Sequence, residues 1–394
     1  MNHVDRWMLP DGIEEVLPEE AHHIEFLRRR LLDLFGRWGY DLVIPSMVEF
    51  TDSLLIGLGQ DLDLQTFKVT DQLSGRSLGI RADITPQAAR IDAHSLRREG
   101  INRLCYAGHV LYTRPKSALA SRNPLQLGVE LFGDDTIEAD IEVVSLLLST
   151  LSEAGHTDLH IDLGHVGIFK VLAAEAGLSP ASEREFFELL QAKAMADITA
   201  WVDANLAGNP CAEWLRALPR LAGAASVLQE AKEVFKGAPH AVRQALDELI
   251  ILAETLVERY PRAHLYFDLS ELRGYHYHTG IVFAAFAPGV GEAIATGGRY
   301  DHIGEVFGRA RPATGFSANL VALKRLAQPS CDLPMGIFVP FSTHPAQWQE
   351  VERLRASGER VVSGAKNQSL PHDYQACDRL LAEVDGQFEI QSLA

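Results

Sequence analysis

The chain has 394 residues, enough for two or three domains and a substantial core. Hydrophobic residues make up 47% and charged residues 23%, as in ordinary globular proteins, and no apolar run approaches the ~20 residues of a membrane span. The net charge is −17, which disfavours nucleic-acid binding by the bulk of the chain, although a local basic patch could still bind.

The N-terminus and the cysteines indicate the compartment. Residues 1–20 are acidic and lack the apolar core of a signal peptide, so we expect a cytoplasmic protein. The four cysteines lie far apart and form no C-x-x-C pair. This spacing argues against a disulfide framework or a zinc finger and predicts reduced, mostly buried thiols.

The first third of the chain alternates helical and extended patterns. In EAHHIEFLRRRLLDLFGRW (20–38) apolar residues recur at helical spacing, which predicts an amphipathic helix. The following segments are predicted to be, in order, a strand over 39–50, a hairpin around a Ser-Gly turn over 65–85, a helix over 86–100 that stops at Gly100, and strands over 104–115 and 125–133.

The rest of the chain predicts three further regions. Residues 167–260 are rich in alanine and leucine with helical patterning, which predicts a helical insertion. Strand patterns return within 261–327, so residues 1–166 and 261–327 are predicted to form one body. Residues 331–394 predict a small α/β domain in which three strands alternate with two helices. The whole is an α+β pattern with an antiparallel-looking sheet.

Five motifs occur in the order in which histidyl-tRNA synthetases carry them. They are GYDLVIPSM (39–47), GRSLGIRADIT (75–85), LQLGVELFG (125–133), LRGYHYHTG (272–280) and ATGGRYD (295–301). Together they cover about residues 10–326, and the chain resembles that family of class II aminoacyl-tRNA synthetases. The resemblance implies an antiparallel sheet flanked by helices, and a homodimer whose interface includes the first motif.

The positions that serve ATP in the family are altered. Class II enzymes use fixed arginines to meet the negative charge that builds on the α-phosphate. By the resemblance, Leu111 replaces the arginine of the second motif and Thr113 its glutamate. The third motif reads Asn319, Val321 and Ala322, without its glutamate and arginine. One such contact is worth about 3 kcal/mol or more, so the resemblance implies no catalytic residues and no amino-acid activation.

The amino-acid positions are better kept. The resemblance implies a histidine pocket made by Asp83, Thr85, Gln126, Glu130, Arg273, Tyr277 and His278. Asp83 could hold an α-ammonium group, Glu130 could accept from an imidazole N–H, and Arg273 could bind a carboxylate. His278 replaces a family tyrosine, so the imidazole-binding edge is changed. Solvated strand carboxylates and a structural ion pair of the arginine remain the alternatives.

The interleaved rings of residues 275–278 allow a second interpretation. On a strand, His276 and His278 would share one face, as a metal-binding pair could, with Tyr275 and Tyr277 on the other face. No third ligand is evident nearby, so metal binding is disfavoured. Packing against the sheet explains any one of these rings equally well.

A synthetase-like body, an altered ATP site and a short tail resemble the regulatory subunits of ATP phosphoribosyltransferase, most closely in RADITPQAARIDAH and GYHYHTGIVF. The resemblance implies a chain without catalysis or cofactor that activates a short-form catalytic subunit and mediates feedback inhibition by L-histidine. It also implies a homodimer within a larger hetero-oligomer.

Two enzymatic alternatives stay open: a divergent histidine–tRNA ligase, and a ligase or transferase that has repurposed the fold. Residues 331–394 contain five Lys/Arg and nine Asp/Glu, a difference of −4, which disfavours tRNA binding. Both the tail and the helical insertion are candidate contact surfaces for a catalytic partner.

Overall fold

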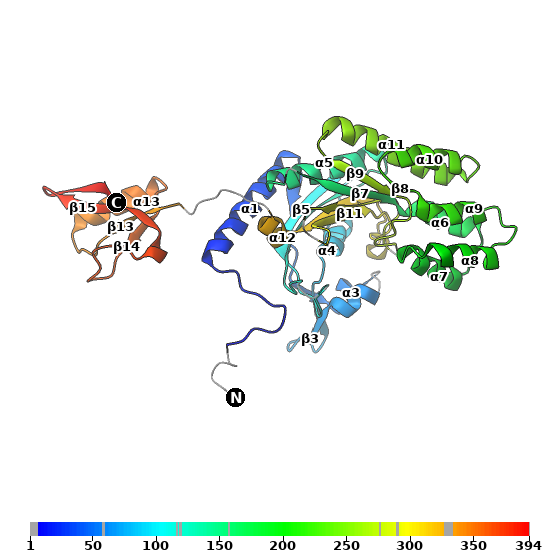
Figure 1. Cartoon of the computed structure of the whole chain (residues 1–394). Helices are drawn as coiled ribbons and strands as arrows, with labels where there is room; N and C mark the ends of the chain where they lie inside the picture. Colours follow the sequence, from blue (N-terminus) through cyan, green and yellow to red (C-terminus); the bar gives the residue numbers. More distant parts are fainter. Residues whose placement is uncertain are drawn as a thin grey trace. The chain divides into compact units, whose positions relative to one another are not determined.

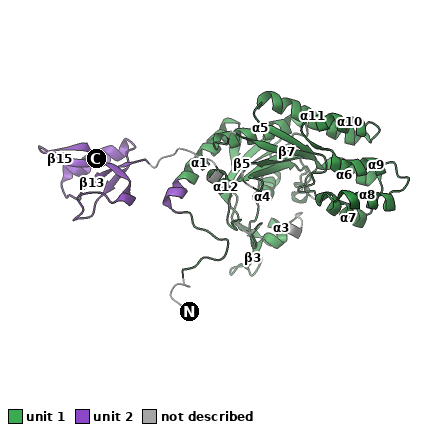
Figure 2. Cartoon of the chain, in the orientation of Figure 1, with its two compact units in different colours: residues 1–16, 23–329 green, residues 17–22, 330–394 purple. Residues whose placement is uncertain are grey.

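The computed structural model describes residues 7–56, 60–115, 117, 120–156, 158–275, 277–288, 291–326 and 334–393. The chain divides into two compact units, a large one of residues 1–16 and 23–329 and a small one of residues 17–22 and 330–394 (Figure 2). Within the described ranges, no helix is both long and apolar enough to cross a membrane.

A nine-stranded sheet forms the centre of the large unit. Its order is β1 (Asp41–Leu42), β5 (Asn102–His109), β6 (Leu125–Phe132), β12 (Ala313–Asn319), β11 (Ala295–Arg299), β10 (Ile281–Phe286), β7 (His160–His165), β9 (His264–Asp268) and β8 (Ala222–Gly223). The pairs from β5 to β7 are antiparallel, whereas β1–β5 and β7–β9 are parallel. This arrangement confirms the predicted α+β class and antiparallel sheet.

Two long helices pack on the sheet through apolar faces (Figure 1). In α1 (Pro18–Arg37) the predicted amphipathic face is confirmed, and its buried residues are Ile24, Leu27, Leu31, Leu34 and Phe35. The ring of Phe35 meets Phe316 of β12 edge-on, with centroids 6.1 Å apart. α5 (Ile137–Glu153) contacts β6 and β12. Burial of these faces supplies the main driving force for the docking of both helices.

The segment after β7 is helical. It contains α6 (Val166–Glu175), α7 (Pro180–Gln191), α8 (Met195–Asn205), α9 (Ala212–Ala217), α10 (Ser226–Val234) and α11 (His240–Arg259). α11 contacts α5, α6 and β7, and the short strand β8 pairs with β9. The segment therefore shares the core and the sheet of the large unit, while the boundary of 167–260 stays a prediction.

A three-stranded sheet is formed by the part of the chain between β1 and the helix that starts at Thr85. Its order is β2 (Val48–Phe50), β4 (Ser77–Ile80) and β3 (Phe67–Thr70), with the short helices α2 (Thr51–Leu54) and α3 (Gln60–Gln65) between its strands. The predicted hairpin is confirmed as β3–β4. The predicted strand over 39–50 is wrong as a single element, because Pro45 has no N–H and β1 and β2 join different sheets.

The predicted helix over 86–100 is shorter than expected. α4 (Thr85–Arg90) continues as a π-helical turn over Ile91–Leu96. Arg97 then adopts a left-handed conformation with φ 49°, which ends the helix three residues before Gly100. Predicting the end from the glycine was therefore wrong.

The small unit contains a four-stranded sheet of order β14 (Val361–Ser363), β13 (Gly336–Val339), β15 (Cys377–Val384) and β16 (Gln387–Ser392), and the helix α13 (Pro345–Ala356). The second helix predicted for the tail is wrong, because only a 3₁₀ turn over Asp373–Gln375 and the strand β15 occupy that region. β15 and β16 form a hairpin whose turn residues, Asp385 and Gly386, have φ of 49° and 80°.

The cysteines follow the expectation of free thiols where the structure describes them. Cys105 and Cys211 are buried and Cys377 is partly buried, and all three are unbonded. Cys331 lies outside the described residues.

Candidate functional site

A cavity of about 220 Å³ opens beside β6, β11 and β12 in the large unit. Six of the seven predicted site residues line it: Asp83, Thr85, Glu130, Arg273, Tyr277 and His278. Gln126 does not line the cavity but lies behind one of its walls. Residues of three motifs that are far apart in the sequence therefore meet at one place.

Glu130 forms the buried floor of the cavity. Its Oε1 accepts a hydrogen bond from the Tyr106 hydroxyl at 3.0 Å, and its Oε2 accepts one from the Tyr300 hydroxyl. Burial raises the pKa of Glu130 to about 8, although the hydroxyl donors oppose this rise. The site thus holds a carboxyl group that is mostly protonated near neutral pH until a ligand supplies a donor or a positive charge.

Gly315 on β12 allows Glu130 to occupy this position. A Cβ at Gly315 would collide with Glu130 Oε2 and with the carbonyl oxygen of Val129. Glycine within a strand often marks such a close approach of a neighbouring group. The two tyrosines that hold Glu130 were not predicted. Tyr300 belongs to the GGRYD motif, which could have indicated a role in the site, whereas Tyr106 belongs to none of the family motifs.

A second carboxylate lies at the other side of the cavity. Asp83 Oδ1 accepts hydrogen bonds from the Thr85 backbone N–H at 3.1 Å and from Gln126 Nε2 at 2.8 Å. Gln126 Oε1 in turn accepts from the Ile84 N–H at 2.9 Å. Both contacts use the same oxygen of Asp83, and no hydrogen bond from the described residues reaches Oδ2. Gln126 therefore orients Asp83 and leaves one carboxylate oxygen for a cation.

The LRGYHYHTG segment is a turn and not a strand. Gly274 has φ 64°, and its carbonyl oxygen accepts from the N–H groups of Tyr277 and His278, both at 2.8 Å. The expectation that alternate residues share a face is therefore wrong. His276 lies outside the described residues, so the structure does not test the metal pair of His276 and His278, which the sequence disfavours.

The two tyrosines of this turn point to different surroundings. Tyr275 packs against Phe169 at 5.4 Å and donates a 2.6 Å hydrogen bond to Glu183 of α7. Tyr277 stacks on Tyr300 with ring centroids 5.0 Å apart and an interplanar angle of 17°. Tyr275 is thus a packing residue, and Tyr277 is a wall of the cavity.

His278 presents a defined tautomer. Its Nδ1 lies 3.2 Å from the Arg299 carbonyl oxygen, which can only accept, so Nδ1 carries the proton and the neutral ring keeps Nε2 as an acceptor. Burial lowers the pKa of His278 to about 4, and Lys170, whose Nζ donates to the His278 carbonyl at 2.6 Å, favours the neutral ring as well. The ring is therefore uncharged at neutral pH.

Arg273 lies at the rim with 40% of its side chain exposed. Its guanidinium group makes one loose ion pair, with Glu271 at 3.5 Å, within the part of the chain that the structure describes. The Glu271 carboxylate also accepts from the Arg273 backbone N–H at 2.8 Å, which holds the turn. Most donors of this guanidinium group are left for solvent or a ligand.

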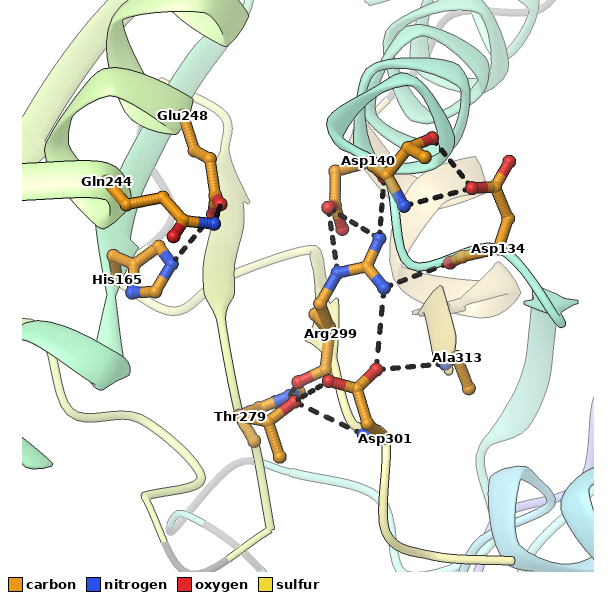
Figure 3. Close-up of polar contacts among 11 residues, drawn as sticks. Asp134, Asp140, His165, Gln244, Glu248, Thr279, Arg299, Asp301 and Ala313 are labelled. Atoms are coloured by element: carbon orange, nitrogen blue, oxygen red, sulfur yellow. Dashed lines mark hydrogen bonds and ion pairs between the residues drawn. The ribbon is translucent and has the colours of Figure 1, made fainter. Parts of the chain in front are cut away.

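A buried ion pair supports the cavity from behind (Figure 3). Arg299 Nε and Nη2 donate to Asp140 Oδ2 at 2.9 and 2.8 Å, and Nη1 donates to the Asp134 carbonyl at 3.0 Å. The pair joins β11 to the first turn of α5. Because the Arg299 carbonyl binds the His278 ring and the next residue is Tyr300, the pair fixes two walls at once. We used GGRY only as part of a family motif and did not predict that Arg299 supports the cavity.

In synthetases, the second and third motifs bind ATP. At the corresponding positions, this chain has uncharged side chains that make contacts within the fold. Leu111 is aliphatic, and Thr113 Oγ1 donates to the Leu64 carbonyl at 2.6 Å. Asn319 Oδ1 accepts from the N–H groups of Val321 at 3.1 Å and Ala322 at 3.5 Å, so it caps α12 (Leu320–Leu326). None of these side chains is cationic.

Arg81, the first residue of the RADIT motif, is buried, and its guanidinium group binds backbone carbonyls. Its Nε donates to the His109 carbonyl and its Nη1 to the Pro45 carbonyl, both at 2.8 Å. Burial lowers the pKa of its guanidinium group. Arg81 therefore does not replace the missing arginines.

The fold and the cavity define the class of protein. Residues 12–323 match the family described as histidyl-tRNA synthetase. A crystal structure of an ATP phosphoribosyltransferase regulatory subunit/histidyl-tRNA synthetase from Bacillus halodurans C is similar with a TM-score of 0.81, at 27% identity over 93% of this chain and 95% of that chain. A histidyl-tRNA synthetase from Nostoc sp. PCC 7120 shares the fold, with a TM-score of 0.76 at 17% identity and coverage of 98% and 97%.

The tail and the full-length relatives narrow the class. Residues 334–391 match the ATP phosphoribosyltransferase subunit HisZ C-terminal domain. The ATP phosphoribosyltransferase regulatory subunit of Saccharophagus degradans is 60% identical over 391 residues, with 99% of both chains covered. That of Teredinibacter turnerae is 59% identical over 394 residues, with 100% of both covered. The chain belongs to the family of ATP phosphoribosyltransferase regulatory subunits.

Proposed function

We propose that this chain activates a short-form catalytic subunit of ATP phosphoribosyltransferase and transmits feedback inhibition by L-histidine. Its family gives it a regulatory role in histidine biosynthesis. The observation that supports activation and histidine feedback in particular is a difference between the amino-acid side and the nucleotide side of the synthetase-like site. Polar groups suited to an amino acid line the cavity, whereas the nucleotide positions hold Leu111 and Ala322.

Histidine fits the chemistry of the cavity group by group. Arg273 at the rim suits the α-carboxylate, and the open oxygen of Asp83 suits the α-ammonium group. Glu130 and the neutral His278 ring can both accept from an imidazole N–H. We assign the same seven predicted residues to this site, with Gln126 acting through Asp83 and Thr85 through Tyr106, which its hydroxyl meets at 3.1 Å.

The chain itself is proposed to be non-catalytic and to need no cofactor. Fixed positive charge near the α-phosphate is the main requirement of amino-acid activation, and the altered positions supply none. Feedback then requires that histidine and the active complex favour different conformations. Couplings of this kind are typically about 1–3 kcal/mol.

A tRNA-binding tail is disfavoured by its ion pairs. Three of its arginines are paired within the small unit: Arg353 with Glu350 at 2.6 Å, Arg355 with Glu352 at 3.2 Å and Arg379 with Glu359 at 2.9 Å. Arg360 donates to the carbonyls of Gln375 and Ala376. Phosphate binding would have to break these contacts, which weakens the alternative of a divergent histidine–tRNA ligase.

A homodimer through the first motif is part of the proposal. Four apolar side chains in 42–48 are largely exposed in the single chain: Leu42 at 51%, Ile44 at 87%, Met47 at 41% and Val48 at 38%. A grouped set of exposed apolar residues favours an interface.

We also place the protein in the cytoplasm and in a larger complex with the catalytic subunit, as the sequence predicted.

The test is phosphoribosyl-ATP formation by a short-form catalytic subunit, measured alone, with this chain, and with this chain plus histidine. We expect stimulation that histidine reverses. Arg273→Gln should keep the stimulation and lose the histidine effect. Arg309→Gln is the matched control and should behave as wild type, because Arg309 does not line the cavity and pairs with Glu99 at 3.0 Å. An unchanged rate under every condition would refute the regulatory proposal.

A further inference from the structure

Two histidines far apart in the sequence meet on the sheet. His160 begins β7 and His264 begins β9, and the two residues are direct partners in the parallel register. Paired residues of neighbouring strands project to the same face of a sheet. Their rings are accordingly stacked, with centroids 4.7 Å apart and an interplanar angle of 19°.

A carboxylate completes the cluster. Asp158 lies in the loop before β7, and its Oδ1 is 3.3 Å from His160 Nε2 and 3.2 Å from His264 Nε2. The three possible ligand atoms all lie within 4.8 Å of one another. We propose that Asp158, His160 and His264 bind a divalent transition-metal ion of the Zn²⁺ type.

The spacing fits such an ion. Zn²⁺ binds imidazole nitrogen at about 2.0–2.1 Å and carboxylate oxygen at about 2.0–2.2 Å, so two tetrahedral ligands lie about 3.4 Å apart. The two nitrogen–oxygen distances are already close to this value. The side chains are exposed, so the small rotations that bring both nitrogens to an ion meet little resistance.

The ligand set selects the kind of ion. Two imidazoles and one carboxylate suit Zn²⁺, Co²⁺, Ni²⁺ or Cu²⁺, whereas Mg²⁺ and Ca²⁺ prefer an all-oxygen set. Water can fill the remaining positions because the side chains are 48%, 64% and 55% exposed for His160, His264 and Asp158. Bound ion would join the start of β9 to β7, and the chain runs from β9 into the turn that carries Arg273.

The experiment titrates the untagged, chelator-treated full chain with Co²⁺, followed by visible absorption, and with Zn²⁺, followed by calorimetry. We expect one ion per chain and a rise in melting temperature with added Zn²⁺, since a ligand that binds the folded state stabilises it. His264→Gln and Asp158→Asn should each weaken binding by more than about 10-fold.

His302→Gln is the matched control. His302 is another exposed histidine that meets a carboxylate, Glu305, at 2.7 Å, but it has no second histidine in a three-ligand group within the described residues. This variant should bind Zn²⁺ as wild type does. Circular dichroism without metal checks that all variants fold. Failure of the wild type to bind at millimolar Zn²⁺, or equal binding by wild type and His264→Gln, would overturn the proposal.

Discussion

The two sides of the synthetase-like site are built differently. On the amino-acid side a buried carboxyl, Glu130, is held by two tyrosine hydroxyls, and glycine on the next strand makes room for it. On the nucleotide side Leu111 and Ala322 are ordinary aliphatic residues. Burying a carboxyl group costs free energy unless it is hydrogen-bonded, and the two tyrosine hydroxyls offset this cost for Glu130. The difference is what we expect if the chain, as proposed above, keeps an amino-acid pocket and lacks the fixed charges of phosphate chemistry.

The largest expected effect concerns the nucleotide side. Two arginine positions are lost, and each such contact is worth about 3 kcal/mol or more, so histidine-dependent ATP–pyrophosphate exchange should be at least ~10⁴-fold below that of a working histidyl-tRNA synthetase. The exchange assay uses the purified chain with a histidyl-tRNA synthetase as the positive control. Exchange at a rate near that of the control would remove the contrast between the two sides.

The second prediction tests the support behind the amino-acid side. Asp140→Asn should lower the free energy of unfolding by about 3–5 kcal/mol, because it neutralises the buried and closer of the two carboxylates that pair with the Arg299 guanidinium group and leaves only the more exposed Asp301, at 3.4 Å. Urea denaturation measures the change. Asp203→Asn, which removes an exposed partner of Arg216, is the control and should cost less than about 1 kcal/mol. Equal losses in both variants would show that the buried pair is not special.

The third prediction concerns Glu130 as a ligand group. Glu130→Gln should weaken histidine binding by about 10- to 100-fold, since hydrogen bonds to charged groups are worth about 1.5–3 kcal/mol. Isothermal calorimetry gives the affinity. Glu138→Gln, an exposed glutamate on α5, is the matched control and should bind as wild type. Unchanged affinity in Glu130→Gln would exclude the carboxyl from the histidine site.

The same group predicts a pH dependence of stability. The pKa of Glu130 is about 8 in the folded chain and near 4.5 ordinarily, so between these values the folded state holds a proton that the unfolded state has lost. This contribution to the free energy of unfolding is full below pH 4.5 and decreases as pH rises toward 8. Denaturation at several pH values should show a flatter profile for Glu130→Gln than for wild type, and identical profiles would contradict the assignment.

The smallest effect on histidine affinity is expected for a substitution on the nucleotide side of the site. Leu111 does not line the cavity, so Leu111→Ala should change histidine affinity by less than about 2-fold. Calorimetry alongside Glu130→Gln makes the comparison direct. A loss as large as that of Glu130→Gln would mean that the two sides act as one site.

Patterns that extend over many residues predicted the fold best. The apolar stripe of α1 and the apolar runs of β5, β6, β10 and β12 are each long enough to identify the element. Short signals misled. Pro45 splits one predicted strand between two sheets, a left-handed Arg97 ends the π-helical turn after α4 before Gly100, and the strand β15 lies where the tail pattern predicts a helix. In each case partners distant in sequence, or one backbone torsion angle, decided the outcome.

By itself, the amino-acid sequence determined which residues of the family's motifs are present and which are replaced, because side-chain identity needs no fold. It thereby predicted six of the residues that line the cavity, and it showed that the two arginine positions are replaced. Only the tertiary structure decided their surroundings. The tyrosine donors to Glu130, the Arg299–Asp140 support and the meeting of His160 with His264 all join strands or helices far apart in the chain. Such contacts depend on which strands and helices the fold places side by side, and short local sequence patterns do not encode that arrangement.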